Sequence, residues 1–347
     1  MLPRGRLQPG RRSSILRTHF SAPSAGIVRK VIPTERVCLF DGHCDTISYC
    51  RDNNGGIRRS AGHLDLERTA SFGPCAQFFA IFSDFAVESD LSPWQLFQEE
   101  YDIFRREMMS NADLAVHCRT AKEATDAFRA GKCAAFLSVE GAELLDCDLG
   151  RLEEVYRLGV RAVNLTWNHA NILSGSNAEE QKRGLSEQGK AFVQKMNQLG
   201  MLVDVSHLSD PGFWDVAEVC KGPFVASHSN ARAVFSVPRN LTDGQFTAII
   251  EHHGVAGLNM FAGFLGEDPD YDTVISHLEH FLSLGGEKSV AIGGDWDGIS
   301  KMPRGMSGIQ DMAELYERLL RRNYSEALVR DVFFNNLMRV VSEVCTM

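Results

Sequence analysis

The stretch "VCLFDGHCDT", residues 37–46, joins an apolar run to a group of polar residues. Its first four residues predict a buried strand. If the chain stays extended beyond them, His43 and Asp45 point the same way, because side chains alternate along a strand. Both residue types are common metal ligands. The simpler interpretation is a strand that ends in a polar turn at Asp41 and Gly42, so the rest of the chain has to decide.

The chain continues as an alternation of short apolar runs and longer amphipathic stretches. Eight runs are predicted to be strands, and most are almost wholly apolar, as in strands covered on both faces. Eight strand-then-helix units over about 260 residues match a closed parallel (β/α)8 TIM barrel. A doubly wound open sheet is the alternative, but no Gly-x-Gly-x-x-Gly motif follows the first strand. The predicted strands are residues 37–40, 77–82, 134–139, 160–165, 202–205, 223–226, 255–260 and 290–292.

Ionisable residues follow five of these predicted strands. Catalytic residues of such barrels come from the carboxyl ends of the strands, so these side chains are expected to meet at one mouth of the barrel. Each one alone is more often a capping or turn residue than a ligand. Together, three histidines and several carboxylates have the composition of a two-metal hydrolytic site. The candidates are His43, Asp45, Glu140, His207, His228, Asp295 and Asp297.

Composition and charge exclude several classes of protein. The 347 residues have a net charge of −9, although segment 1–34 contains seven basic residues and no acid. The remainder is therefore strongly acidic and does not suit nucleic acid, whose binding needs clustered lysine and arginine. No apolar run approaches the roughly 18 residues of a membrane span, so a membrane role is not expected. The nine cysteines are odd in number and include no Cys-x-x-Cys pair, which indicates reduced thiols and a cytoplasmic location.

The amino-terminal segment differs from the rest in composition. Residues 1–34 are rich in Arg and Ser, as a transit peptide is, yet they lack the apolar core of a secretion signal. A disordered basic arm, a targeting segment and an expression remnant are equally compatible with this composition. We expect residues 35–347 to form a single catalytic barrel domain.

Six motifs occur in an order that resembles the renal or membrane dipeptidase family of zinc peptidases. The resemblance covers roughly residues 37–345, which is nearly everything beyond the basic segment. It implies a TIM barrel of the metallo-dependent hydrolase type with two Zn²⁺ ions per chain. The motifs are DGHCDT at 41–46, SVEG at 138–141, DVSH at 204–207, ASHS at 226–229, PRN at 238–240 and GGDWDG at 293–298.

The resemblance also implies a role for each residue of these motifs. His43 and Asp45 would bind one zinc, His207 and His228 would bind the other, and Glu140 would bridge both. Two zinc ions would lower the pKa of a shared water from about 15.7 toward about 7, so no protein nucleophile is required.

Two further residues complete this implied site. Arg239 would bind the terminal carboxylate of the substrate through its planar, bidentate guanidinium group. Asp295 would accept a proton from the attacking water and pass it to the leaving amine. A clamp on the terminal carboxylate limits substrate length, so dipeptides are the expected substrates, including L-Xaa-D-Xaa pairs that the family tolerates.

One position departs from the family. Mammalian members have a histidine after "LT" on the fourth predicted strand, where it helps to stabilise the tetrahedral intermediate, and this chain has Trp167 there. His169 could replace that histidine only if its loop turns inward. Otherwise the oxyanion would depend on zinc and on Asn168.

Other functions remain compatible with these residues. The same metal site could hydrolyse a lactone, a cyclic amide or another small amide, because only the pocket distinguishes these substrates. A non-catalytic metal-binding barrel is the third alternative, and the presence of all five ligands argues against it. A homodimer is compatible with the sequence, which does not determine the oligomeric state.

Overall fold

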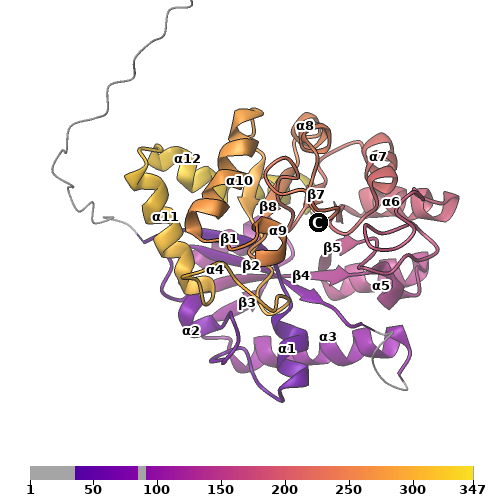
Figure 1. The fold of residues 1–347 in the computed structure, drawn as a ribbon. Coiled ribbons are helices and arrows are strands. Elements are labelled where there is room, and N and C mark those ends of the chain that lie inside the picture. Colours follow the sequence, from indigo (N-terminus) through magenta and orange to yellow (C-terminus); the bar gives the residue numbers. More distant parts are fainter. Residues whose placement is uncertain (1–35, 85–90, 347) are drawn as a thin grey trace, which may run out of the picture. The chain divides into compact units, whose positions relative to one another are not determined.

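The computed structural model describes residues 36–84 and 91–346. Eight parallel strands of this part of the chain close into a barrel with helices outside it (Figure 1). The pairing of Asp41 on β1 with Ile292 on β9, together with the pairing of β2 with β4, completes the ring. Closure excludes the open sheet and confirms the predicted (β/α)8 barrel. The barrel strands are β1 (Leu39–Cys44), β2 (Cys75–Ile81), β4 (Cys133–Glu140), β5 (Val160–Asn164), β6 (Leu202–Asp204), β7 (Val225–Ala226), β8 (Val255–Leu258) and β9 (Val290–Ile292).

All the predicted strands are present, although several ends differ. The largest difference is in β1, which continues through Cys44 instead of ending at Phe40. One short strand, β3 (Ala115–His117), was not predicted. It pairs with the first residues of β4, whereas β5 pairs with β4 only from Leu137 onward, so β3 lies beside the part of β4 that β5 does not reach.

The helices follow the strands as the amphipathic stretches predict. Many of their amino ends are defined by capping side chains such as Ser92, which forms a capping box with Gln95. Gly159 and Gly200 end two of them in the left-handed conformation that glycine adopts at low cost. The helices are α1 (Thr46–Asp52), α2 (Leu66–Thr69), α3 (Pro93–Ser110), α4 (Ala121–Arg129), η1 (Ala142–Leu145), α5 (Leu149–Leu158), α6 (Glu187–Leu199), α7 (Asp210–Val219), α8 (Asp243–Glu251), α9 (Ala262–Leu265), α10 (Tyr271–Ser283), η2 (Ile309–Asp311), α11 (Met312–Arg321), α12 (Glu326–Arg330), η3 (Asp331–Asn335) and α13 (Asn336–Val344).

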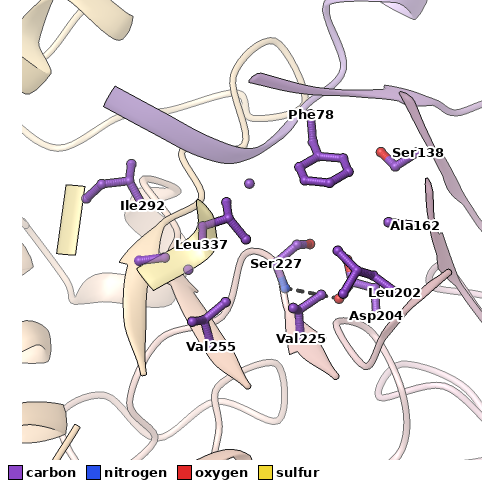
Figure 2. A pocket seen from close by; sticks show the side chains of 13 residues that line it. Phe78, Ser138, Ala162, Leu202, Asp204, Val225, Ser227, Val255, Ile292 and Leu337 are labelled. Carbon is purple, nitrogen blue, oxygen red and sulfur yellow. Dashed lines mark hydrogen bonds between the residues drawn. The ribbon is translucent and has the colours of Figure 1, made fainter. Parts of the chain in front are cut away.

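Apolar side chains fill the amino-terminal part of the barrel interior. Phe40, Phe78 and Phe136 come from three neighbouring strands, and their ring centroids lie 5.2 to 5.8 Å apart. Leu337 of α13 points into the same space (Figure 2). The void that remains is about 10 Å³, which is room for about one water molecule. Substrate therefore has no space here, and the opposite end of the strands is left for chemistry.

A register shift in β1 changes the directions in which its last side chains point. Phe40 and Gly42 face the barrel interior, so strict alternation would send His43 outward. The pairing of β1 with β2 is irregular between Asp41 and Cys44, and such irregularities re-aim side chains. As a result Cys44 packs in the apolar layer with the helices, and His43 turns to the mouth of the barrel.

The predictions for segment 1–34 concern residues that lie outside the described part of the chain. Among the helices that are described, none has the length and hydropathy needed to cross a bilayer.

Candidate active site

The end of β1 supplies the first two side chains of the site. His43 is 1% exposed, and its Nε2 lies 3.5 Å from Asp45 Oδ2. Asp45 occupies the N-cap position of α1, but its side chain makes no capping hydrogen bond. A capping role therefore does not explain Asp45. Its carboxylate faces His43 instead.

Glu140 is the last residue of β4 and lies between two groups of side chains. Its Oε2 is 3.6 Å from His43 Nε2. Its Oε1 is 3.0 Å from His207 Nε2 and 3.3 Å from His228 Nε2. Gly141 follows with a φ of +92°, a left-handed conformation in which a larger residue would be strained. The chain thus leaves β4 sharply and keeps Glu140 at the mouth of the barrel.

His207 and His228 follow β6 and β7, and both rings are held by second hydrogen bonds. His207 Nδ1 donates to Asn168 Oδ1 at 3.0 Å, and His228 Nδ1 is 2.7 Å from Ser227 Oγ. These bonds leave the two Nε2 atoms facing each other at 3.1 Å. Such second hydrogen bonds fix the tautomer of a metal-binding histidine.

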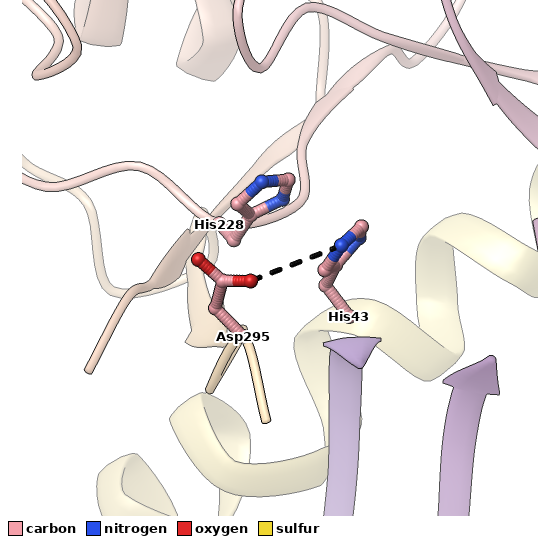
Figure 3. A group of neighbouring side chains, drawn as sticks. All are labelled: His43, His228 and Asp295. Carbon is pink, nitrogen blue, oxygen red and sulfur yellow. Dashed lines mark ion pairs between the residues drawn. The ribbon is translucent and has the colours of Figure 1, made fainter. Parts of the chain in front are cut away.

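Asp295 approaches the same point from the loop after β9 (Figure 3). Its Oδ1 lies 4.0 Å from His43 Nε2, and its Oδ2 accepts a hydrogen bond from Asn259 Nδ2 at 2.8 Å. The His43 and His228 rings are stacked beside it, with centroids 3.8 Å apart. His207 and Asp295 have positive φ angles of 71° and 60°, and non-glycine residues in this conformation cluster at functional sites.

Glycine is required where the GGDWDG motif ends. A β-carbon on Gly298 would collide with Oδ2 of Asp45, and it would lie 2.6 Å from Oδ1 of Asp295. Only movement of these two carboxylates would relieve this overlap, and both belong to the site. Gly298 therefore keeps open the space that the two carboxylates share.

Three buried polar atoms at the centre of this site lack hydrogen-bond partners within the described protein. His43 Nε2, Asp45 Oδ1 and Glu140 Oε1 are buried and make no hydrogen bond that satisfies normal geometry. Leaving such groups unpaired is costly. Two donors on one tetrahedral zinc, each about 2.0–2.1 Å from the ion, lie about 3.3 Å apart. The donor spacings in this site, 3.0 to 3.6 Å, match that value, so the residues present fit a divalent metal.

The electrostatics of these residues show strong mutual coupling. Burial lowers the pKa of His43, but Glu140 and Asp45 outweigh it and hold that pKa well above its ordinary value. Burial would raise the pKa of Glu140, but His43 and His207 hold it well below normal. Burial raises the pKa of Asp45 to about 7 and lowers the pKa of His228 well below normal. A histidine whose Nε2 stays unprotonated can bind a metal.

Arg239 lies at the edge of this group with part of its donor set unused. It is 7% exposed, and its Nη1 donates to Ser229 Oγ at 2.6 Å. Its Nε and Nη2 are buried without hydrogen-bond partners in the described chain. The guanidinium carbon is 5.5 Å from the centroid of the Phe264 ring. Two unpaired N–H groups on a buried guanidinium are suited to a carboxylate.

A cavity of about 230 Å³ opens onto these side chains. It lies below the roughly 300–1,000 Å³ of pockets that hold drug-sized ligands, so only a small ligand fits. Its lining contains both ionisable and aromatic side chains. Its lining includes Asp45, Glu140, His207, Asp295, Asn168, Phe82, Trp167, Phe261 and Phe264.

Two residues that the sequence offered as candidates for the site contact other side chains instead. His169 does not turn inward, because its Nδ1 is 3.0 Å from Glu179 Oε1 and its Nε2 is 3.4 Å from Asp84 Oδ1. Asp297 accepts hydrogen bonds from Thr46 Oγ1 and from the backbone of His63. It therefore fixes a loop and stays out of the metal-binding groups.

Asn259 was not found from the sequence, although it holds Asp295 in place. It is fully buried and follows β8 directly. The rule that led to the other residues, a polar side chain at the carboxyl end of a strand, applies to it as well. Because an amide is neither a common metal ligand nor a proton carrier, only its contact with Asp295 identifies it.

Comparisons with known proteins identify the family of this chain. The family model of the membrane dipeptidases, peptidase family M19, matches residues 30–347. The dipeptidase tcpJ of Claviceps purpurea (strain 20.1) is 28% identical over 324 residues, which cover 88% of this chain and 76% of that protein.

Two solved structures are similar over nearly the whole barrel. One is a metallo peptidase from Rhodobacter sphaeroides liganded with a phosphinate mimic of L-Ala-D-Ala, with a TM-score of 0.79, 28% identity and coverage of 89% of this chain and 100% of that chain. The other is dipeptidase AC, with a TM-score of 0.81, 28% identity and coverage of 90% and 100%. This chain therefore belongs to the membrane dipeptidase family, peptidase family M19, and is a metallo-dipeptidase.

Proposed function

We propose that this metallo-dipeptidase binds two zinc ions and hydrolyses dipeptides, including L-Xaa-D-Xaa dipeptides. The observation that carries the proposal is the position of Glu140, whose two oxygens face two different donor groups. His43 and Asp45 would hold one ion and His207 and His228 the other, with Glu140 shared. Imidazole and carboxylate donors at these spacings suit zinc. When bound, the metal supplies Lewis acidity and a water that is deprotonated near neutral pH.

Arg239 would select and orient the substrate. Its unpaired Nε and Nη2 are placed to bind the carboxylate of a peptide terminus in a bidentate pair. The cavity over the donor groups holds about 230 Å³, a size that suits a short peptide. Both features support a dipeptide as substrate, and the phosphinate mimic of L-Ala-D-Ala bound to a relative supports D-residues at the second position.

Asp295 would move the proton. Its Oδ2 is held by Asn259, which leaves Oδ1 facing the donor groups. During hydrolysis the water oxygen bonds to the carbonyl carbon and its proton passes to Asp295. The C–N bond then breaks, and Asp295 returns the proton to the leaving amine, so that one peptide and one water give a carboxylic acid and an amine. Transfer of the acid proton to the amine then gives a carboxylate and an ammonium ion.

The purified chain loaded with Zn²⁺ should be tested against L,L and L,D dipeptides, tripeptides and a set of lactones. We expect turnover of dipeptides, with an N-acetylated and a C-amidated control separating the contributions of the two termini. Loss of activity on C-terminal amidation supports the Arg239 role. Faster turnover of lactones than of any dipeptide would replace this proposal with the lactonase alternative.

A cytoplasmic location and a homodimer remain proposals. All nine cysteines are free thiols, which supports a reducing compartment. Fractionation of cells tests the location, and light scattering of the purified protein tests the oligomeric state.

A further inference from the structure

Asn168 lies where the cavity meets the ligand His207. It follows Trp167 in the loop after β5 and lines the cavity together with Glu140 and Asp295. Its Oδ1 accepts the hydrogen bond from His207 Nδ1 at 3.0 Å, and its backbone oxygen accepts one from Ser176 Oγ at 2.5 Å. Asn168 is thus held both at its side chain and at its backbone.

The amide nitrogen of Asn168, Nδ2, has no hydrogen-bond acceptor within the described part of the chain. A side-chain amide is planar, so fixing Oδ1 against His207 also fixes the direction of Nδ2, which carries two N–H donors. Nδ2 makes no hydrogen bond within the described part of the chain. A free donor on the wall of the substrate cavity, beside the metal-binding groups, is available to a ligand.

Hydrolysis of a peptide is accelerated by such a donor. When water adds to a peptide carbonyl, the electron pair of the C=O π bond moves to the oxygen, and fixed N–H groups stabilise the charge that develops there. The histidine typical of mammalian relatives is replaced by Trp167, and His169 is engaged with Glu179 and Asp84. Asn168 is the neighbouring residue whose polar group does reach the cavity.

We propose that Asn168 has two roles: its Oδ1 positions His207, and its Nδ2 donates a hydrogen bond to the carbonyl oxygen of the scissile peptide. The second role rests on the proposed dipeptidase function. The first does not, because it concerns only the metal-binding ring. One neutral side chain would then couple the metal centre to the oxyanion.

Two substitutions separate these roles. Asn168→Asp keeps an acceptor for His207 and deletes the N–H donor, whereas Asn168→Ala deletes both. The measurements are Zn²⁺ affinity by competition with a chelator, and kcat and KM with a dipeptide at saturating Zn²⁺. Asn197→Asp, the same change at an exposed position on α6, is the control for the substitution itself and should alter neither quantity.

The proposal predicts that Asn168→Asp binds Zn²⁺ at least as tightly as wild type, because a carboxylate acceptor increases the basicity of the ring. Its kcat should fall about 10²- to 10³-fold with little change in KM, as on removal of one oxyanion donor. Asn168→Ala should lose about 10- to 100-fold in Zn²⁺ affinity as well.

A kcat of Asn168→Asp within threefold of wild type would overturn the donor role. Unchanged Zn²⁺ affinity in Asn168→Ala, or an equal loss of affinity in both variants, would overturn the positioning role. If wild type hydrolysed no dipeptide, the dipeptidase proposal would fail, while the affinity measurements would still decide whether Asn168 positions His207.

Discussion

Two buried polar groups on β1 differ in how they are satisfied, although they are only two residues apart. Asp41 is fully buried and accepts four hydrogen bonds: from the backbone of His43 and Gly294, from Gln77 Nε2 at 3.1 Å and from Trp296 Nε1 at 2.8 Å. His43 Nε2, equally buried, has three carboxylates 3.5 to 4.0 Å away and no hydrogen bond.

This difference indicates that Asp41 stabilises the fold, whereas the group around His43 serves the function. The Asp41 carboxylate is provided with donors by the chain itself, and these hydrogen bonds join β1 to β2 and to the loop after β9. The described residues give His43 Nε2 no such hydrogen bond, and the donor atoms around it are spaced for a cation. Unsatisfied buried groups in a native protein call for such an explanation. Substitutions at the two places should therefore have different effects, on stability at Asp41 and on metal binding or turnover around His43.

The largest effect is expected for Glu140→Gln. A neutral amide cannot serve two metal ions as a carboxylate does, so Zn²⁺ affinity should fall by more than the roughly 100-fold that a lost supporting hydrogen bond costs. Dipeptide turnover should disappear with it. Chelator competition and a turnover assay measure the two effects. A variant that keeps both wild-type affinity and wild-type turnover would remove Glu140 from the site.

Asp295→Asn should separate proton transfer from metal binding. The amide keeps the size of the side chain but accepts no proton, so kcat should fall by about 10²- to 10⁴-fold. The Zn²⁺ content should stay close to that of wild type because His43, Asp45 and Glu140 are intact. Asp297→Asn in the same motif is the comparison, since Asp297 contacts Thr46 and His63 instead. Equal losses of kcat in both variants would contradict the assignment.

Asp41→Asn should reduce stability. An amide must place an NH2 group against N–H donors, which leaves buried groups unpaired at a cost of about 2–4 kcal/mol. Denaturant unfolding of the zinc-loaded protein measures this loss. The exposed Asp102→Asn should change the free energy of unfolding by less than about 0.5 kcal/mol. An Asp41 variant as stable as wild type would mean that the four hydrogen bonds contribute little.

Glu143 lies between these two cases, because it is buried with a hydrogen-bond donor but has a perturbed pKa. Its substitution should give the smallest effect, which is on the pH dependence of stability. It accepts a hydrogen bond from Asn171 Nδ2 at 2.8 Å, and burial raises its pKa from 4.5 to about 7. A raised folded-state pKa means that its contribution to stability is present below pH 4.5 and is lost as the pH rises to about 7. Relative to Glu143→Gln, wild type should lose about 1–3 kcal/mol over this window. A difference in unfolding free energy that is independent of pH would contradict this.

The sequence predicted the barrel and the residues that meet at its mouth for one physical reason. Apolar strands that are covered on both faces are recognisable locally, and in a parallel barrel their carboxyl ends meet. His207 and His228 were found in this way although 21 residues separate them. The register shift in β1 and the strand β3 depend on pairing partners, which no local pattern encodes.

The limits of local reasoning are clearest within GGDWDG. Asp295 and Asp297 share the motif and a left-handed backbone, yet one faces the donor groups and the other holds a loop. Only the tertiary contacts distinguish them. The same applies to Asn168 and Asn259, whose roles come entirely from the side chains they contact.

The most direct test of the central claim is an anomalous-scattering experiment at the zinc edge on crystals of the zinc-loaded protein. Two peaks should appear on either side of Glu140, one bound by His43 and Asp45 and the other by His207 and His228. No peak at these side chains, or peaks only elsewhere on the molecule, would contradict the account.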